Sequence, residues 1–225
     1  MIALRNIVFY LLFVLGSIVC ISMGALTSPL GREHTQRWPD RWSRWHRWLC
    51  ENILAIRVVV EGPQETRPVL YALRHESFFE AIDLPVLLDK PVPFAKAELF
   101  RIPGWRAASR GYGAVEVKRD QGATMLRQMV SQAKGYSAEG RPLCIFPEGT
   151  RVPHGEERAL QSGFAGLYKL LRLPVVPVAV DSGPLYHRFW KRPGTITVRF
   201  HEQIEPGLQR EEIEERVRTA INSLN

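Results

Sequence analysis

The 225-residue sequence predicts an α/β fold, a mixed sheet covered by helices, that follows an N-terminal membrane helix. Two observations carry this prediction: an uncharged apolar stretch near the start, and short β-rich runs that alternate with helical patterns beyond residue 56. With 45% apolar residues the chain is neither disordered nor collagen-like, and its three scattered cysteines favour neither a disulfide framework nor a zinc site. One globular domain with an appendage is expected at this length.

The first expected element is a membrane-anchoring helix over residues 1–31. Residues 6–31 carry no charge, and the 20 residues of 7–26 are long enough as a helix to cross roughly 30 Å of hydrocarbon. A secretory signal peptide is the alternative interpretation. Its apolar region usually has about 7–15 residues, however, and no clean small-residue cleavage site follows in this sequence.

The second expected element is a Trp/Arg-rich interfacial helix over residues 32–55. Four tryptophans recur at steps of 4, 3 and 3, which places them on one helical face, and four arginines follow the same steps beside them. These residues are Trp38, Trp42, Trp45, Trp48, Arg37, Arg41, Arg44 and Arg47. Next to an apolar stretch, this pattern suits the phospholipid headgroup layer. Two alternatives stay open: tryptophans that pack on the main domain, and a two-helix hairpin that lies in one leaflet.

The net charge of the chain indicates an anionic partner. It amounts to +7, and because residues 202–225 hold six Glu and three Arg, the positive charge lies in the preceding part. A phospholipid membrane explains this charge better than a nucleic acid, since the arginines begin beside an apolar stretch. The five arginines between positions 32 and 47 predict a cell (inner) membrane protein with its domain on the cytoplasmic side, by the positive-inside rule.

The globular domain is expected over residues 56–225. Runs rich in β-branched and aromatic residues predict strands, and helical periodicity predicts the helices between them. The expected strands are 57–61, 69–73, 114–117, 143–146, 175–180 and 195–200. The expected helices are 77–88, 104–110, 121–138, 162–171 and 210–223. Functional residues are expected in loops at the strand ends.

The first chemical motif directly follows the strand at 69–73. An imidazole such as that of His75 suits removal of a proton from a hydroxyl, and the carboxylate of Glu80 can hold the ring in one tautomer. Positions i and i+5 do not face each other on a continuous helix, so His75 is expected in the turn before the helix. Ser77-x-x-Glu80 is also a capping box, in which the glutamate only satisfies backbone N–H groups, and both roles stay open.

The second chemical motif is Phe-Pro-Glu-Gly-Thr-Arg at 146–151. Pro ends the strand, Gly149 permits a tight turn, and Arg151 emerges where its guanidinium could grip a phosphate. The alternative is an ordinary turn with an ion pair between Glu148 and Arg151. A segment rich in cations and glycines, which includes Lys96, Arg101 and Arg119, lies between two expected strands. The Val-Pro-Val run at 176–178 favours a buried strand.

The order of these motifs over residues 75–180 resembles the glycerolipid acyltransferase family, which acylates 1-acylglycerol 3-phosphate in phospholipid synthesis. The resemblance implies that His75 is the general base on the free sn-2 hydroxyl of lysophosphatidate, with Glu80 orienting its ring. The hydroxyl would attack acyl-CoA or acyl carrier protein and give phosphatidate, without a metal or a bound cofactor. The implied phosphate-binding residues are Arg151 with its loop residues Glu148 and Gly149, and secondarily Lys96, Arg101 and Arg119.

One residue departs from this family pattern, because Glu80 stands where the family usually has Asp. The longer side chain keeps the carboxylate but shifts its reach, and Asp83 is a possible substitute partner one turn further along. Two alternative functions therefore stay open. One is an acyltransferase of the same family that acts on a different lyso-lipid or an amino-acid lipid, and the other is a non-catalytic, membrane-tethered lipid-binding protein.

Overall fold

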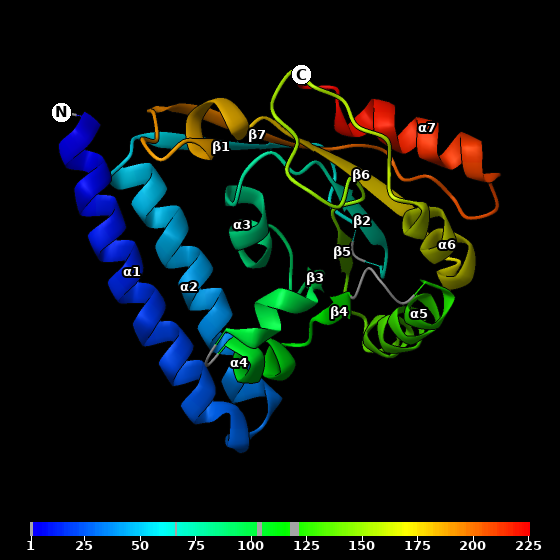
Figure 1. Ribbon diagram of the computed structural model, residues 1–225, viewed down its shortest axis with the longest axis horizontal. Helices are drawn as coiled ribbons and strands as arrows, with labels where there is room; N and C mark the ends of the chain where they lie inside the picture. The colour runs from blue at the N-terminus through cyan, green and yellow to red at the C-terminus, as the bar shows by residue number, and fades with distance from the viewer. Residues whose placement is uncertain (1, 66, 103–104, 118–121) are drawn as a thin grey trace.

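A computed structural model of the chain describes residues 2–65, 67–102, 105–117 and 122–225 (Figure 1). It contains one seven-stranded sheet with helices on both faces, which confirms the predicted mixed α/β fold. The strands lie in the spatial order β1 (Ile56–Glu61), β7 (Gly194–Phe200), β6 (Val175–Val180), β2 (Leu70–Leu73), β5 (Leu143–Ile145), β3 (Val92–Lys96) and β4 (Val115–Val117).

Five neighbouring strands, from β6 to β4, run parallel to one another. β7 is antiparallel to β6, and β1 is parallel to β7, so the sheet is mixed. The carboxyl ends of the five parallel strands meet at one edge of the sheet, where open α/β sheets usually bind their ligands. Both chemical motifs follow strands of this set.

Apolar side chains pack on both faces of the sheet. On β2, Leu70 and Ala72 contact the core under the C-terminal helices, whereas Tyr71 and Leu73 contact the core under the N-terminal helices. This explains why β2 has an unbroken apolar sequence. The helices of the domain are α3 (Phe79–Leu87), α4 (Trp105–Tyr112), α5 (Gly122–Ala138), α6 (Ser162–Leu171) and α7 (Arg210–Ile221). Shorter turns are η1 (Ser28–Leu30), η2 (Ala97–Arg101) and the single π turn η3 (Gly183–His187).

The sequence prediction misses β3 and places the start of α3 two residues too early. Pro91 and Pro93 hide the strand, because proline lacks the N–H that a strand donates to its neighbour. Helix α3 begins at Phe79, whose N–H donates to Ser77 Oγ, and Glu80 accepts the N–H groups of Glu76 and Ser77 in the preceding turn.

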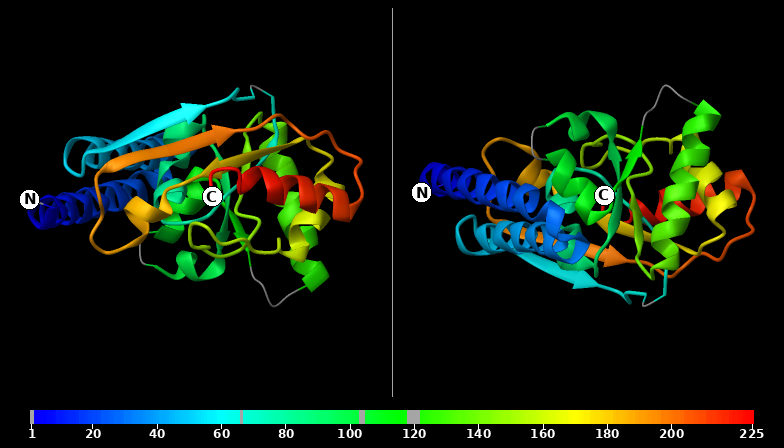
Figure 2. Two further views of the ribbon diagram at one scale, coloured as in Figure 1. Left: turned by 90° about the horizontal axis from the view of Figure 1, so that it is seen from above. Right: turned by 90° about the horizontal axis from the view of Figure 1, so that it is seen from below.

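The two expected N-terminal helices are present as α1 (Ile2–Thr27) and α2 (Arg32–Asn52), which form a hairpin beside the sheet (Figures 1 and 2). The tryptophan face of α2 packs on α1. Trp42 donates from Nε1 to Ser17 Oγ at 2.8 Å, and Trp45 donates from Nε1 to Leu12 O at 3.2 Å. A Cβ at Gly16 would lie 2.3 Å from Trp45 Nε1, so the close approach requires glycine there. Trp42 and Trp45 therefore contact α1, and the ring of Trp45 also packs against the core under the N-terminal helices. The position of the tryptophan face in the headgroup layer stays a prediction.

A different face of α2 docks on the domain. The guanidinium of Arg47 pairs with the fully buried carboxylate of Asp83 on α3, with 3.0 Å between Nε and Oδ1, so Arg47 is not a headgroup contact. His46 Nε2 lies 2.7 Å from the hydroxyl of Tyr186 in η3. The arginines of the predicted row that are exposed are Arg37, Arg41 and Arg44.

Helix α1 is apolar on its outer side as well. Within the described residues, α1 and η1 form the one helical stretch that is long and apolar enough to cross a membrane, and little of it is buried. The exposed side chains include Ile7, Leu11, Val14, Leu15 and Ile18. An apolar surface of this length is typical of a lipid contact.

Candidate active site

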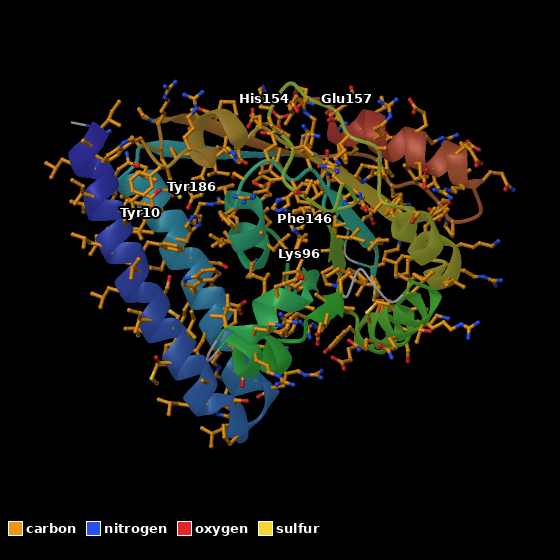
Figure 3. All side chains as sticks on the ribbon, viewed as in Figure 1. Tyr10, Lys96, Phe146, His154, Glu157 and Tyr186 are labelled. Carbon is orange, nitrogen blue, oxygen red and sulfur yellow. The ribbon has the colours of Figure 1, made fainter. Side chains whose placement is uncertain are left out.

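His75 lies in the turn between β2 and α3, as its spacing from Glu80 predicts. The backbone N–H of Arg74 still donates to Val178 O on β6, and the chain then leaves the sheet. The imidazole of His75 stacks on the ring of Phe146, with 4.2 Å between centroids (Figure 3 labels Phe146), and its side chain is 17% exposed. The two motifs of the sequence therefore meet at this ring.

The carboxylate of Glu80 is fully buried and receives bonds on both oxygens. Its Oε1 lies 2.9 Å from His75 Nδ1 and accepts the backbone N–H groups of Glu76 and Ser77 at 2.6 and 2.8 Å. Its Oε2 accepts the hydroxyl of Ser182 at 2.7 Å and lies 3.1 Å from Ser77 Oγ. Glu80 thus contacts the histidine and satisfies backbone N–H groups at the same time, because one carboxylate has enough acceptor sites for both.

Glu80 is held in its ionised form. Burial raises its pKa, but the hydrogen bond and charge of His75, with the bonds from Ser182 and Ser77, outweigh burial and lower the pKa below its usual value. An ionised carboxylate only accepts hydrogen bonds, so His75 carries its proton on Nδ1. None of the described residues bonds to Nε2, which is left with a lone pair for a substrate hydroxyl.

Replacement of Glu80 by Gln is expected to reduce turnover more than stability. The amide keeps the shape of the side chain but loses the charge that stabilises the imidazolium, so kcat should fall roughly 10²-fold or more. Turnover and the unfolding temperature measured on both proteins check this, with the exposed Glu211→Gln on α7 as control.

A loss of thermal stability with normal specific activity would reduce Glu80 to a helix cap. The pH dependence is a second readout. Because the folded-state pKa of Glu80 is lowered, its ionised form stabilises the fold fully above the unfolded-state pKa, and this stabilisation is lost as the pH falls through the folded-state pKa. The stability difference between the wild type and Glu80→Gln should therefore shrink on acidification.

A buried ion pair joins the two motif loops. Arg74 is fully buried, pairs with Glu148, and donates to the carbonyl oxygens of Pro153 and Glu156 at 3.1 and 2.6 Å. The second oxygen of Glu148 accepts the backbone N–H of His75 at 3.1 Å. The alternative ion pair between Glu148 and Arg151 is therefore wrong, because the Glu148 carboxylate faces the interior and is occupied there. Glu148 is placed to shape the loop that carries Arg151.

The remaining phosphate candidates lie in different places. Gly149 makes the turn at a φ of +69°, where glycine is favoured, and Arg151 emerges exposed with its guanidinium 4.1 Å from the ring centre of Phe78. Lys96 ends β3, the parallel neighbour of β5, so it lies at the same sheet edge as the second motif. Arg101 is exposed at the end of η2. Arg119 lies outside the described residues.

Several site residues are missed by the sequence prediction. One is Ser182, which follows β6. Another is Glu76, which is fully buried. Its Oε2 accepts the N–H of Gly183 at 2.7 Å, and its Oε1 lies 3.1 Å from His154 Nδ1. One feature of the sequence could have found Ser182. The Val-Pro-Val run predicts strand β6, which is parallel to β2, so the residues that follow β6 lie beside those that follow β2, including His75. Asp83 is not a substitute partner for His75, because Arg47 occupies it.

An apolar cavity lies where α1, α2, α3 and α4 meet. It encloses about 110 Å³ and is lined among others by Cys20, Ile21, Trp38, Ile82 and Tyr112. Ala81, which directly follows the site residue Glu80 on α3, also lines it. Within the described part of the chain, no cluster of His, Cys, Asp and Glu side chains has the arrangement of a metal site.

Comparisons with known proteins show the family of this chain. A family model described as "Acyltransferase" matches residues 55–181, which include both motifs. The 1-acyl-sn-glycerol-3-phosphate acyltransferase of Pseudomonas aeruginosa is 29% identical over 87% of this chain and 79% of its own length. The human 1-acyl-sn-glycerol-3-phosphate acyltransferase beta is 28% identical over 66% of this chain and 56% of its own length.

The fold has a solved relative. The crystal structure of the 1-acyl-sn-glycerophosphate (LPA) acyltransferase from Thermotoga maritima superposes with a TM-score of 0.76 and 23% identity, over 99% of this chain and 95% of the other. At this identity the likeness concerns the fold, while the family model matches residues 55–181, which is more than half of the chain. The chain therefore belongs to the acyltransferase family.

Proposed function

We propose that this protein transfers a fatty acyl group from acyl-CoA or acyl carrier protein to the sn-2 hydroxyl of lysophosphatidate, giving phosphatidate. The observation that carries the proposal is the His75–Glu80 dyad, whose Nε2 is open to a substrate beside the loop that presents Arg151. The relatives named above support lysophosphatidate as the acceptor.

The proposed reaction is a direct transfer between the two substrates. His75 Nε2 takes the proton of the acceptor hydroxyl while its oxygen attacks the thioester carbonyl carbon, and the ionised Glu80 stabilises the imidazolium that forms. Collapse of the tetrahedral intermediate breaks the C–S bond, and the leaving thiolate takes the proton back from His75. No covalent acyl-enzyme and no bound cofactor are needed.

The acyl chain has a candidate place in the cavity between α1, α2, α3 and α4. Its walls are almost entirely apolar, and Ala81 connects them to the helix that carries Glu80. Because α1 contributes Cys20 and Ile21 to the lining, a chain that extends into the cavity would reach the side of the molecule that faces lipid.

The membrane contact follows from the helical hairpin. Docking of α2 on the domain and packing of α1 on α2 hold both helices along the molecule, which favours a hairpin in one leaflet over a spanning helix. The exposed Arg37, Arg41 and Arg44 suit anionic headgroups. We place the domain on the cytoplasmic side of the cell (inner) membrane, because the proposed thioester donors are cytosolic.

The proposal is tested by acyl-transfer assays on purified protein with paired acceptors that differ in the phosphate. The pair is lysophosphatidate and monoacylglycerol, and both thioester donors are supplied. The wild type should prefer lysophosphatidate, and Arg151→Ala should raise KM for this acceptor by roughly tenfold, since a charged hydrogen bond contributes about 1.5–3 kcal/mol. Arg172→Ala is the matched control, because Arg172 is an exposed arginine at the C-terminal cap of α6.

The assay also discriminates the alternatives. If Arg151→Ala impairs the neutral acceptor equally, Arg151 does not recognise phosphate. Acylation of another lyso-lipid or of an amino-acid lipid, without acylation of lysophosphatidate, would move the protein to a different acceptor class. Absence of transfer to every acceptor, with retained lipid binding, would leave a lipid-binding protein.

A further inference from the structure

A second apolar surface lies on the domain itself, in the loop formed by residues 188–192, here named the aromatic loop. Phe189 is 68% exposed and Trp190 is 47% exposed, and their rings contact each other edge to face at 5.3 Å. Large aromatic side chains are rarely this exposed next to each other unless they contact another molecule. The catalytic chemistry proposed above does not use them.

The aromatic loop is held firmly against the N-terminal turns of α1 (Figures 1 and 3, beside the labelled Tyr10 and Tyr186). Tyr10 donates its hydroxyl to Phe189 O at 2.6 Å, and the two rings stack at 4.9 Å. The side-chain amide of Asn6 bonds to both backbone groups of Lys191, at 2.9 and 2.8 Å. The backbone of the loop is therefore fastened to α1 at two nearby residues, Phe189 and Lys191.

A buried ammonium group stabilises the loop from within. Lys191 is 7% exposed, and its Nζ donates to Tyr186 O at 2.9 Å and Arg188 O at 3.3 Å. The same Nζ lies 3.8 Å from the centre of the Tyr186 ring. With the lysine turned inward, the outward residues of the loop are the two aromatics and the exposed Arg188 and Arg192.

The aromatic loop continues the apolar surface of α1. Ile2, Leu4 and Ile7 are exposed on the same turns of α1 to which the loop is fastened. Aromatic rings suit the boundary between headgroups and acyl chains, and arginines beside them suit lipid phosphates. Both the apolar continuity and the positive charge favour an anionic phospholipid bilayer as the occupant of this surface.

We propose that the aromatic loop is a second membrane contact, with Phe189 and Trp190 inserted in the bilayer interface and Arg188 and Arg192 on anionic headgroups. The inference deepens the proposed function, since it rests on a membrane location of the enzyme. A contact at α1 alone leaves the domain free to rotate about the helix axis, whereas a second contact fixes its tilt.

The position of the loop in the chain connects this contact to the active site. Ser182, which donates to Glu80, and Gly183, which donates to Glu76, begin the π turn η3 that leads into the aromatic loop. One short segment thus contacts the catalytic carboxylate at one end and lipid at the other. This arrangement sets the height of His75 and Glu80 above the bilayer, where the lipid acceptor must arrive.

The test uses site-specific fluorescence on the full chain. Cys50 and Cys144 are fully buried, so a Cys20→Ser background carrying Phe189→Cys or Trp190→Cys can be labelled with an environment-sensitive dye at the loop. Leu170→Cys on α6, where Leu170 is 42% exposed, is the matched control. Each protein is reconstituted with vesicles of phosphatidylethanolamine and phosphatidylglycerol.

We expect dyes at 189 and 190 to be quenched by a lipid-borne nitroxide and to show a several-fold lower iodide quenching than the dye at 170. Iodide quenching at 189 and 190 as strong as at 170, on vesicle-bound protein, would overturn the inference, as would failure to bind the vesicles. Two positions are labelled in separate proteins so that the conclusion does not depend on one substitution that disturbs the loop. Because the readout involves no acyl transfer, its failure is distinct from failure of the proposed reaction.

Discussion

Replacement of His75 by Ala should abolish acyl transfer while the protein still binds membranes. Removal of the proton acceptor takes away a contribution of about 10²–10⁴-fold in turnover, and no other imidazole lies at the Glu80 carboxylate among the described residues. The surfaces proposed to contact lipid are on α1 and the aromatic loop, so vesicle binding should not depend on this ring. Turnover and vesicle co-sedimentation, measured on the same preparation, check both parts.

His154→Ala is the matched control for this experiment. His154 is 33% exposed and bonds to Glu76 rather than to Glu80, so its loss should leave most of the turnover intact. Activity of His75→Ala close to that of the wild type would end the general-base assignment. Equal losses in both variants would instead indicate that the loop as a whole, and not the dyad, carries the effect.

Replacement of Arg74 by Met should have the largest effect on stability. The change leaves the buried carboxylate of Glu148 without its ion-pair partner and removes the donors to the carbonyl groups of Pro153 and Glu156. Loss of one member of a buried pair costs roughly 3–5 kcal/mol of the free energy of unfolding. Denaturant unfolding of the detergent-solubilised protein measures this difference.

The control is Arg210→Met, because Arg210 forms an exposed pair with Glu214 on α7. Its effect should be small, since solvent screens exposed pairs. The double variant Arg74→Met/Glu148→Leu should recover part of the stability, because it removes the isolated charge. An effect of Arg74→Met no larger than that of Arg210→Met would contradict the role of the pair in joining the two loops.

Local sequence rules predict much of the catalytic dyad. The helical angle between positions i and i+5 requires His75 in a turn and Glu80 in a helix, and the structure has both. The same rules allow the capping box, and they have no means of choosing between the two roles. In the structure Glu80 has both roles, because its Oε1 contacts the His75 ring and also accepts a backbone N–H.

Pairings between distant segments are where sequence prediction fails. Arg47 and Arg151 are both candidate contacts for phosphate groups on the sequence, yet Arg47 pairs with buried Asp83, whereas Arg151 stays exposed. Likewise Glu148 is three residues from Arg151 and 74 residues from Arg74, and it pairs with the distant arginine. Sequence periodicity predicts which face of a helix or strand is apolar. The ion-pair partner of a charged side chain, in contrast, depends on which helices and strands the fold brings together.

The amino-acid sequence by itself determines the apolar N-terminal helix, the α/β alternation, and the family to which the two motifs point. Each of these follows from local composition and spacing, which the chain carries before it folds. Only the tertiary structure decides that the tryptophans of α2 pack on α1, that Ser182 completes the setting of Glu80, and that Phe189 and Trp190 extend the surface of α1. These contacts join residues far apart in sequence, so they exist only once the sheet and the helical hairpin have assembled.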